Sequence, residues 1–409
     1  MGQLSTTAFL ISSALKVLGV FTIWLLAVAG VTLAERKVAA WIQDRSGPNR
    51  VGPWGTFQPL ADGLKNFVKE ENLPAGASRW LFYLAPVISM FPAFVVFAVI
   101  PFAAPLATPW GGVNMVIADL PIGFLFIVAL GSLGVYGLVL GGWASNSKYP
   151  FLGGVRASAQ MISYEVALGL SLVPILMLSG NVSLPGIVHQ QQQSLWFVLP
   201  LLVGLLFFTI SYFAETNRLP FDMPEAESEL VYGFHTEYSA MKFAMFMMAE
   251  YSNLIIASAL IVTFFFGGWD IPFWTGDDLR YAADGSIAGG QSAWWITLLT
   301  GLAYALKVGF FVFLYIWVRW TVPRFRYDQV MALGWKILIP LLVVYIIVLG
   351  AVMLLLEGAG ITFGTRYLLW LTALNLILML GIMFWLDRSR IIVGTGWRQM
   401  RPQQAKPRG

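Results

Sequence analysis

Long apolar stretches separated by polar segments follow one another along almost the whole chain. A helix needs about 20 mostly apolar residues to cross the roughly 30 Å hydrocarbon core of a bilayer. Nine stretches meet that length, so we predict an all-α polytopic integral membrane protein, a single membrane domain over residues 1–409. The predicted spans cover residues 8–33, 80–104, 120–142, 157–179, 195–213, 239–266, 293–318, 336–356 and 367–386.

Two polar segments, 34–79 and 214–238, are longer and more charged than ordinary connecting loops, which have about 4–6 residues. They are therefore expected to form a docking surface. Between residues 58 and 70, apolar and charged side chains alternate at helical spacing, which predicts a short amphipathic helix in the membrane interface. The apolar positions are Leu60, Leu64, Phe67 and Val68, and the charged positions are Asp62, Lys65 and Lys69. A surface helix that only packs against a neighbour has the same pattern.

Lysine and arginine are concentrated in alternate segments between the spans. The segments after the first, third, fifth and seventh spans, together with the C-terminal tail, hold 19 of the 25 basic residues. Because basic residues are retained on the cytoplasmic side, the N-terminus is predicted outside and the C-terminus in the cytoplasm. Both long polar segments are then cytoplasmic. The tail, 387–409, is expected to be a basic end near anionic lipid headgroups.

The composition agrees with a membrane protein and limits its chemistry. The chain is 58% hydrophobic and 11% charged, whereas a soluble domain has about 25% charged residues. It has no cysteine, so it supplies no thiolate ligand to an iron–sulfur cluster, and its two histidines, His189 and His235, argue against a histidine metal site. Any redox cofactor is expected in a partner. The 25 basic residues only slightly outnumber 21 acidic ones and form no aromatic-interleaved run, which argues against nucleic-acid binding.

Acidic residues inside the predicted spans are the clearest chemical signal in the residues themselves. Glu165 and Glu250 lie within spans, Glu215 ends the fifth span, and a loop rich in carboxylates follows, with Glu225 and Glu227 among them. An ionised carboxylate near the centre of a bilayer costs about 2.5–3.5 kcal/mol even on the mildest scale. Such a group of carboxylates is expected to carry protons. The alternative is a set of structural ion pairs, formed with Lys242, Lys307 or Lys336.

A run of charged residues directly follows the first predicted span. Guanidinium groups such as those of Arg36 and Arg45 could lie at the mouth of an apolar cavity, where they would bind the carbonyl oxygens of an amphipathic ligand. Simple contact with lipid headgroups is the alternative. His235 is the other titratable feature of the inner loops, and a lone histidine at an interface is more often structural.

Four blocks of sequence, in order across residues 35–340, closely resemble a known family. The first joins Glu35-Arg36-Lys37 to Gly47-Pro48-Asn49-Arg50-Val51-Gly52-Pro53 and Gln58-Pro59-Leu60-Ala61-Asp62-Gly63-Leu64-Lys65. The second joins Gly142-Trp143-Ala144-Ser145-Asn146-Ser147-Lys148-Tyr149 to Ala159-Gln160-Met161-Ile162-Ser163-Tyr164-Glu165-Val166. The third joins Glu215-Thr216-Asn217-Arg218 to Pro220-Phe221-Asp222 and Pro224-Glu225-Ala226-Glu227. The fourth joins Pro323-Arg324-Phe325-Arg326-Tyr327-Asp328-Gln329 to Gly334-Trp335-Lys336. The family that they resemble is the H subunit of bacterial proton-pumping NADH:quinone oxidoreductase, the counterpart of ND1 in respiratory complex I.

The resemblance implies a place where the membrane arm meets the hydrophilic redox arm in the bacterial inner membrane. Quinone would be bound as substrate, and no FMN or iron–sulfur cluster would be held by this chain. Carried over by motif, the residues of the quinone chamber or its entrance are Glu35, Arg36, Arg45, Asp62, Lys65 and Phe221. Those of the proton path are Glu165, Glu215, Glu225, Glu227 and Glu250. Other subunits of the same complex are the implied partners, and ubiquinone and menaquinone both stay possible.

Two other functions are compatible with parts of the pattern. The equivalent subunit of a membrane-bound hydrogenase or formate hydrogenlyase is the nearer one, although the long block at 35–65 favours the quinone enzyme. A stand-alone proton- or cation-coupled transporter is the alternative from another class, and the long charged loops and the lack of a visible repeat argue against it. The span 367–386, the tail after it and the outside loop 267–292 match no block, so no function is carried onto them.

Overall fold

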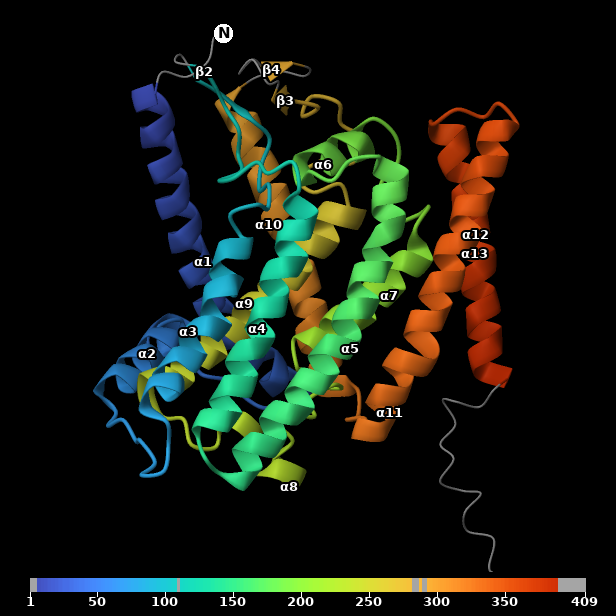
Figure 1. Cartoon of the computed structure of the whole chain (residues 1–409). Coiled ribbons are helices and arrows are strands. Elements are labelled where there is room, and N and C mark those ends of the chain that lie inside the picture. The colour runs from blue at the N-terminus through green and yellow to red at the C-terminus, as the bar shows by residue number, and fades with distance from the viewer. Residues whose placement is uncertain (1–5, 109–110, 282–286, 289–292, 389–409) are drawn as a thin grey trace, which may run out of the picture.

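The computed structural model describes residues 6–108, 111–281, 287–288 and 293–388, and over these residues the chain is a bundle of helices (Figure 1). The long helices are α1 (Thr6–Ile42), α3 (Arg79–Val96), α4 (Gly123–Ala144), α5 (Lys148–Ser179), α9 (Ala240–Phe265), α10 (Trp294–Thr321), α12 (Ile339–Gly358) and α13 (Thr365–Arg388). The shorter ones are α2 (Gln58–Val68), α6 (Leu184–Gln192), α7 (Leu202–Glu215), α8 (Glu227–Leu230) and α11 (Tyr327–Ala332).

Irregular helical turns and two small hairpins complete the described structure. The turns are η1 (Pro53–Gly55), η2 (Gly233–His235) and the π-helical η3 (Leu333–Leu338), which joins α11 to α12. The hairpins pair β1 (Leu106–Thr108) with β2 (Gly111–Val113) and β3 (Arg280–Tyr281) with β4 (Ile287–Ala288), both antiparallel. In Figure 1 these hairpins and α6 lie at one end of the bundle, whereas α2, α8 and α11 lie at the other.

The predicted all-α membrane fold is confirmed, and one of the nine predicted spans differs from the rest. Eight helices of the described chain are long and apolar enough to cross a bilayer. The fifth predicted span, 195–213, forms only the 14-residue helix α7 (Leu202–Glu215), because residues 197–201 form turns and Pro200 has no N–H to donate to a helical hydrogen bond. The amide of Asn375 on α13 donates to the Pro200 carbonyl over 2.6 Å, and its oxygen accepts from the Val203 N–H over 3.3 Å.

The first helix is longer than its apolar stretch, which corrects the predicted boundary at residue 33. The segment 34–42 continues α1 without a break, because alanine, glutamate, arginine and lysine are good helix formers. The helix ends where Asp44 adopts a positive φ of 51° and the Arg45 N–H donates to the Ala40 carbonyl. Glu35 and Arg36 therefore lie on a rigid helix and not in a loop.

The centre of the bundle is formed by α3, α4, α5, α7 and α9, which pack against one another. Glycine allows the closest approach: a Cβ at Gly137 on α4 would lie 2.6 Å from the Ser89 backbone nitrogen on α3. In Figure 1, α1 lies at one edge of the bundle and α12 and α13 lie together at the opposite edge. The termini of α7 and the middle of α9 are thus enclosed by other helices.

Helix α2 forms where amphipathic spacing predicts it, with Pro59 in its first turn. Its apolar side chains are left uncovered by the described chain, and Phe67 and Val68 are 69% and 87% exposed. A helix with an uncovered apolar face and a charged opposite face suits the membrane interface better than water.

Candidate functional site

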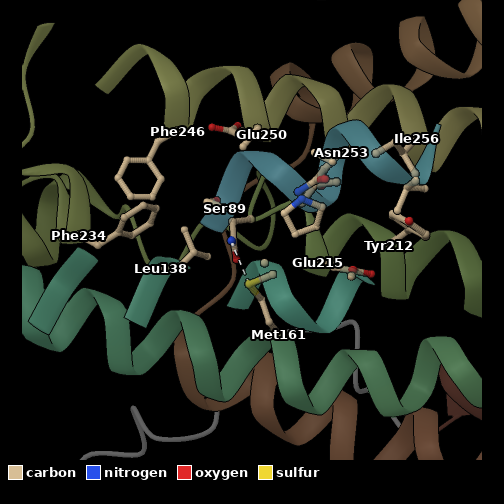
Figure 2. A pocket seen from close by; sticks show the side chains of 18 of the residues that line it. Ser89, Leu138, Met161, Tyr212, Glu215, Phe234, Phe246, Glu250, Asn253 and Ile256 are labelled. Carbon is tan, nitrogen blue, oxygen red and sulfur yellow. Dashed lines mark hydrogen bonds between the residues drawn. The ribbon is translucent and has the colours of Figure 1, made fainter. Parts of the chain in front are cut away.

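A polar cavity lies in the middle of the bundle, between α3, α4, α5, α7, α9 and the loop 214–238. In Figure 2, Glu250 reaches it from α9 and Glu215 reaches it from the end of α7, with Asn253 and Tyr212 nearby. About 50 Å³ of the cavity can be occupied by the centres of water molecules, whereas a single water needs about 10–15 Å³. Water therefore has room between the carboxylates.

Glu215 also borders a second, smaller cavity, on whose wall Glu165 lies. The Ser132 hydroxyl on α4 donates a hydrogen bond to Glu165. Gly131 leaves room for the neighbouring carboxylate, because a Cβ at this position would lie 3.3 Å from Glu215 Oε1. Glu215 Oε2 is buried and has no hydrogen-bond partner among the described residues. The two cavities share Glu215, which places this side chain between Glu165 and Glu250.

Arg218 is the centre of a buried charge network. It lies 2.9 Å from Glu35 Oε2 and 2.7 Å from Glu250 Oε1, and its guanidinium lies 4.3 Å from the centre of the Tyr251 ring. Arg319, from the end of α10, pairs with the other oxygen of Glu35. Arg218 is 2% exposed and Glu35 is 5% exposed, so these charges are largely removed from water. The network joins α1, α9 and α10 through the loop after α7.

The loop 214–238 carries two further carboxylates, Asp222 and Glu225, whose pKa values are raised to about 7. Asp222 pairs with Arg324 over 2.8 Å, and Glu225 Oε1 lies 2.9 Å from His235 Nε2. Burial raises the pKa of Asp222 to about 7, and the neighbouring Glu225 adds to this effect. Burial likewise raises the pKa of Glu225 to about 7, although arginines including Arg319 oppose it. The pKa values of both carboxyl groups are thus shifted toward neutral pH.

The residues assigned by motif to the quinone chamber occupy three separate places. Arg36 and Asp62 form an ion pair of 2.6 Å between α1 and α2, with side chains 50% and 36% exposed. Arg45 and Lys65 are exposed near them. Phe221 is buried, with its ring 5.5 Å from Tyr164 and from Phe325, and Glu35 belongs to the Arg218 network.

The residues assigned to the proton path are brought together more closely. Glu215, Glu225 and Glu250 line the same cavity, and Glu165 shares the adjoining one with Glu215. The side chain of Glu227 lies outside the described part of the structure, although its backbone begins α8. The predicted acidic group is therefore assembled from α5, α7, α9 and one loop.

The ion pairs considered from sequence have different partners. Lys242 pairs with Glu71 over 3.2 Å, and Lys307 donates to the backbone carbonyls of Phe266, Gly268 and Asp270. No ion pair joins Lys336 to a carboxylate among the described residues. Arg218 and Arg319, and not these lysines, pair with Glu35 and Glu250.

Sequence reasoning missed Arg319, His235 and Ser132 as members of the site. In the sequence, Arg319 is one of the basic residues that predict the cytoplasmic side, so nothing about it suggests a contact with the buried Glu35. A lone interface histidine suggests a structural role for His235, yet its imidazole pairs with Glu225. Ser132 belongs to a glycine-rich stretch without any charge. Only the fold brings these side chains to the carboxylates.

Three carboxylates at the opposite end of the bundle lie close enough to hold a metal ion. One ligand atom each from Asp270, Asp277 and Asp278 lies within 4.8 Å of the others. Trp196 Nε1 donates to Asp270 over 2.6 Å, and the Ile271 N–H donates to Asp277 over 2.8 Å. The ammonium of Lys307 adjoins the same loop, so we assign no metal to this cluster.

The fold and the site define an all-α polytopic membrane protein in which buried carboxylates line a cavity and one of them, Glu250, also pairs with a buried arginine. The sequence model of the family described as NADH dehydrogenase matches residues 15–350. The chain belongs to the family of NADH-quinone oxidoreductase H subunits. It is thus one subunit of an oxidoreductase complex and is not catalytic alone. Helix α13 lies beyond the matched residues.

Several relatives are similar over most of their length. H subunit 1 of NADH-quinone oxidoreductase from Cytophaga hutchinsonii is 46% identical over 347 residues, which is 85% of this chain and 98% of the relative. H subunit 1 from Geobacter metallireducens is 48% identical over 340 residues, 83% of this chain and 96% of the relative. The H subunit from Leptospira biflexa is 48% identical over 344 residues, 81% of this chain and 92% of the relative.

Proposed function

We propose that this chain forms part of the quinone chamber of an NADH-quinone oxidoreductase and couples quinone reduction to proton translocation through its buried carboxylates. Other subunits of the membrane arm and the quinone-site subunits of the hydrophilic arm are its partners in this proposal. The complex lies in the bacterial inner membrane, with the N-terminus of this chain outside and its C-terminus in the cytoplasm. Quinone is a substrate, and the electrons reach it from a cluster held by a partner.

The observation that carries the proposal is the opposite orientation of two consecutive residues on α1. Arg36 pairs with Asp62 at the exposed surface next to α2, whereas Glu35 is buried between Arg218 and Arg319. One peptide bond therefore separates this exposed ion pair, which we take as the mouth of the quinone chamber, from the buried charge network. A change of charge at the mouth acts on Glu35 through a short, poorly screened distance.

From Glu35 the contacts lead inward to the cavity. Arg218 binds both Glu35 and Glu250, and Glu250 lines the cavity with Glu215. Glu215 then adjoins Glu165. Quinone reduction consumes protons and changes the charge at the mouth, so the arginine network would redistribute and change the proton affinity of Glu250 and Glu215. This sequence of contacts supports the coupling part of the proposal.

The test is Glu215→Gln in the assembled complex, compared with Glu357→Gln at the exposed end of α12. Glutamine keeps the shape of the side chain but carries no exchangeable carboxyl proton. NADH-driven proton pumping is expected to fall about 10-fold or more in Glu215→Gln. NADH:ferricyanide activity, which reports only the upstream redox reactions, stays unchanged, and Glu357→Gln pumps normally. Full pumping by Glu215→Gln would refute the acidic path.

A further inference from the structure

We propose that His235 is a proton-relay residue, whose imidazole takes a proton from Glu225 at Nε2 and releases another from Nδ1 into the cavity shared by Glu215 and Glu250. The inference rests on the proposed function, because it names the side chain through which Glu225 communicates with the rest of the acidic path. It assigns a role in proton transfer to a residue whose sequence context suggests only a structural one.

The geometry holds the ring in one orientation. His235 Nε2 lies 2.9 Å from Glu225 Oε1, and the side chain is only 2% exposed. Its ring lies 4.0 Å from the ring of Phe234 and 5.3 Å from that of Phe246, and Phe243 packs on it as well. Aromatic rings on several sides keep the imidazole from turning away from Glu225.

The second ring nitrogen is buried without a protein partner. His235 Nδ1 has no hydrogen-bond partner among the described residues, although it is removed from solvent. Leaving such a group unsatisfied costs about 1–3 kcal/mol. His235 and Glu225 both line the cavity that has room for water, so a water there gives Nδ1 its partner. The ring therefore connects a carboxyl group on one side with water on the other.

The proton affinities of the pair favour a relay over a fixed ion pair. Burial lowers the pKa of His235 to about 4, although Glu250 and Asp222 oppose this shift. Since burial raises the pKa of Glu225 to about 7, the imidazole is uncharged at the pH at which Glu225 exchanges its proton. The other groups facing the pair are Glu215 across the cavity, Arg218, Arg319 and the ring of Tyr232.

The proton balance follows from the two hydrogen-bonding states of a neutral imidazole. When Glu225 is protonated, its O–H donates to Nε2 and the ring proton is on Nδ1. When Glu225 is ionised, Nε2–H donates to the carboxylate and Nδ1 carries no proton. Passing from the first state to the second breaks the Glu225 O–H bond and the Nδ1–H bond, forms the Nε2–H bond, and delivers one proton to the cavity. The reverse exchange loads Glu225 from the cavity.

The experiment is His235→Asn in the assembled complex, with His189→Asn, the other histidine of the chain, as the matched control. Asparagine preserves a polar side chain but cannot accept a proton at one atom and release one from another. Proton pumping and coupled quinone reduction are expected to fall about 10-fold or more at pH 6.5. The difference between His235→Asn and the parent should become smaller as the pH rises above 7. Glu225 is then ionised, so the parent also has no proton on Glu225 to pass to His235. Complex assembly and NADH:ferricyanide activity stay at the parent level.

Each other outcome decides against the relay. Activity of His235→Asn within twofold of the parent from pH 6 to pH 8 overturns it, and so does a loss that is equal at every pH, which marks a packing defect. If His235→Asn does not assemble, His235→Gln takes its place, and failure of both to assemble makes His235 a packing residue. Glu215→Gln separates the two proposals. If the Glu215→Gln complex is fully coupled, the whole acidic path is rejected. If Glu215→Gln is uncoupled but His235→Asn is fully active, only the relay is rejected.

Discussion

Arg218 is the residue on which the buried charges converge. It contacts Glu35 and Glu250 at the same time, and the ring of Tyr251 packs on its guanidinium. A lysine would offer one point charge, whereas the planar guanidinium faces two carboxylates in different directions. This geometry places a positive charge beside both carboxylates at a depth where a lone carboxylate would take up a proton.

We predict that Arg218→Met strongly destabilises the complex. Removing Arg218 leaves Glu250 without an arginine partner and Glu35 with Arg319 alone, and breaking a buried pair costs about 3–5 kcal/mol. Arg156→Met is the control, because its pair with Glu229 is 30% and 46% exposed and such surface pairs contribute about 0–1 kcal/mol. The measurement is the fraction of complex that survives a temperature ramp after solubilisation. Equal survival of the two variants would contradict the central role of Arg218.

A substitution of Arg36 tests the exposed side of α1, opposite the buried Glu35. Its pair with Asp62 is half-exposed, so Arg36→Ala is expected to leave assembly intact. If Arg36 guides the quinone headgroup, inhibitor-sensitive NADH:quinone reduction falls several-fold, while NADH:ferricyanide reduction is unchanged. Lys69→Ala, an exposed cation just after α2, is the control. Unchanged quinone reduction in Arg36→Ala would mean that the pair only contacts lipid headgroups.

At the scale of elements, the short helix α7 depends on α13. Asn375 supplies both a donor and an acceptor to the irregular segment before α7, and its oxygen also accepts from the Tyr345 hydroxyl of α12 over 2.9 Å. Backbone groups left unpaired within a membrane are costly, so a broken helix needs such a partner. Because Glu215 ends α7, the position of this carboxylate depends on a helix beyond the matched family region.

Asn375→Ala is accordingly expected to lower the stability of the complex by about 1–3 kcal/mol, since it leaves the Pro200 carbonyl and the Val203 N–H unpaired. Thr372→Ala is a suitable control, because the Thr372 hydroxyl donates to the carbonyl of Leu368 within its own helix. The temperature at which α12 and α13 become sensitive to protease in membranes measures the difference. If both variants are cleaved at the same temperature, α13 does not support α7 through Asn375.

At the scale of the whole molecule, the two ends of the bundle differ in charge and structure. The hairpins and α6 lie at one end, and α2, α8 and α11 lie at the other, which carries the long charged segments (Figure 1). In the topology that the basic residues predict, the second end faces the cytoplasm. A redox arm would dock there, next to the pair of Arg36 and Asp62.

Reporter fusions test this orientation directly. A reporter after Gly268 is expected outside and a reporter after Arg326 in the cytoplasm, because α10 separates the two positions. Alkaline phosphatase is active only outside and a fluorescent protein reports the cytoplasm, so each fusion site can be made with both. Both sites on the same side would contradict the topology, and the reverse arrangement would place the docking surface on the wrong face.

The membrane class, most of the helices and the identity of the carboxylates could be predicted from the residues alone. Apolar stretches of span length and charges within them are local properties, since the cost of burying a residue in lipid depends mainly on that residue. The short amphipathic helix α2 was predictable for the same reason, from the spacing of Leu60 and Leu64 against Asp62 and Lys65. The motifs around Glu35 and Glu215 pointed to the family.

Which charges meet depends on how the helices pack in three dimensions. Arg319 and Glu35 are separated by 284 positions, and Arg218 and Glu35 by 183, so no local pattern encodes their contact. The helical continuation of α1 to Ile42 turns Glu35 inward and Arg36 outward, which a boundary drawn from hydropathy does not show. The pairing of His235 with Glu225 likewise depends on a loop folded over the cavity. Ionisation and proton exchange depend on such neighbours, because burial and nearby charges set the free energy of each protonation state.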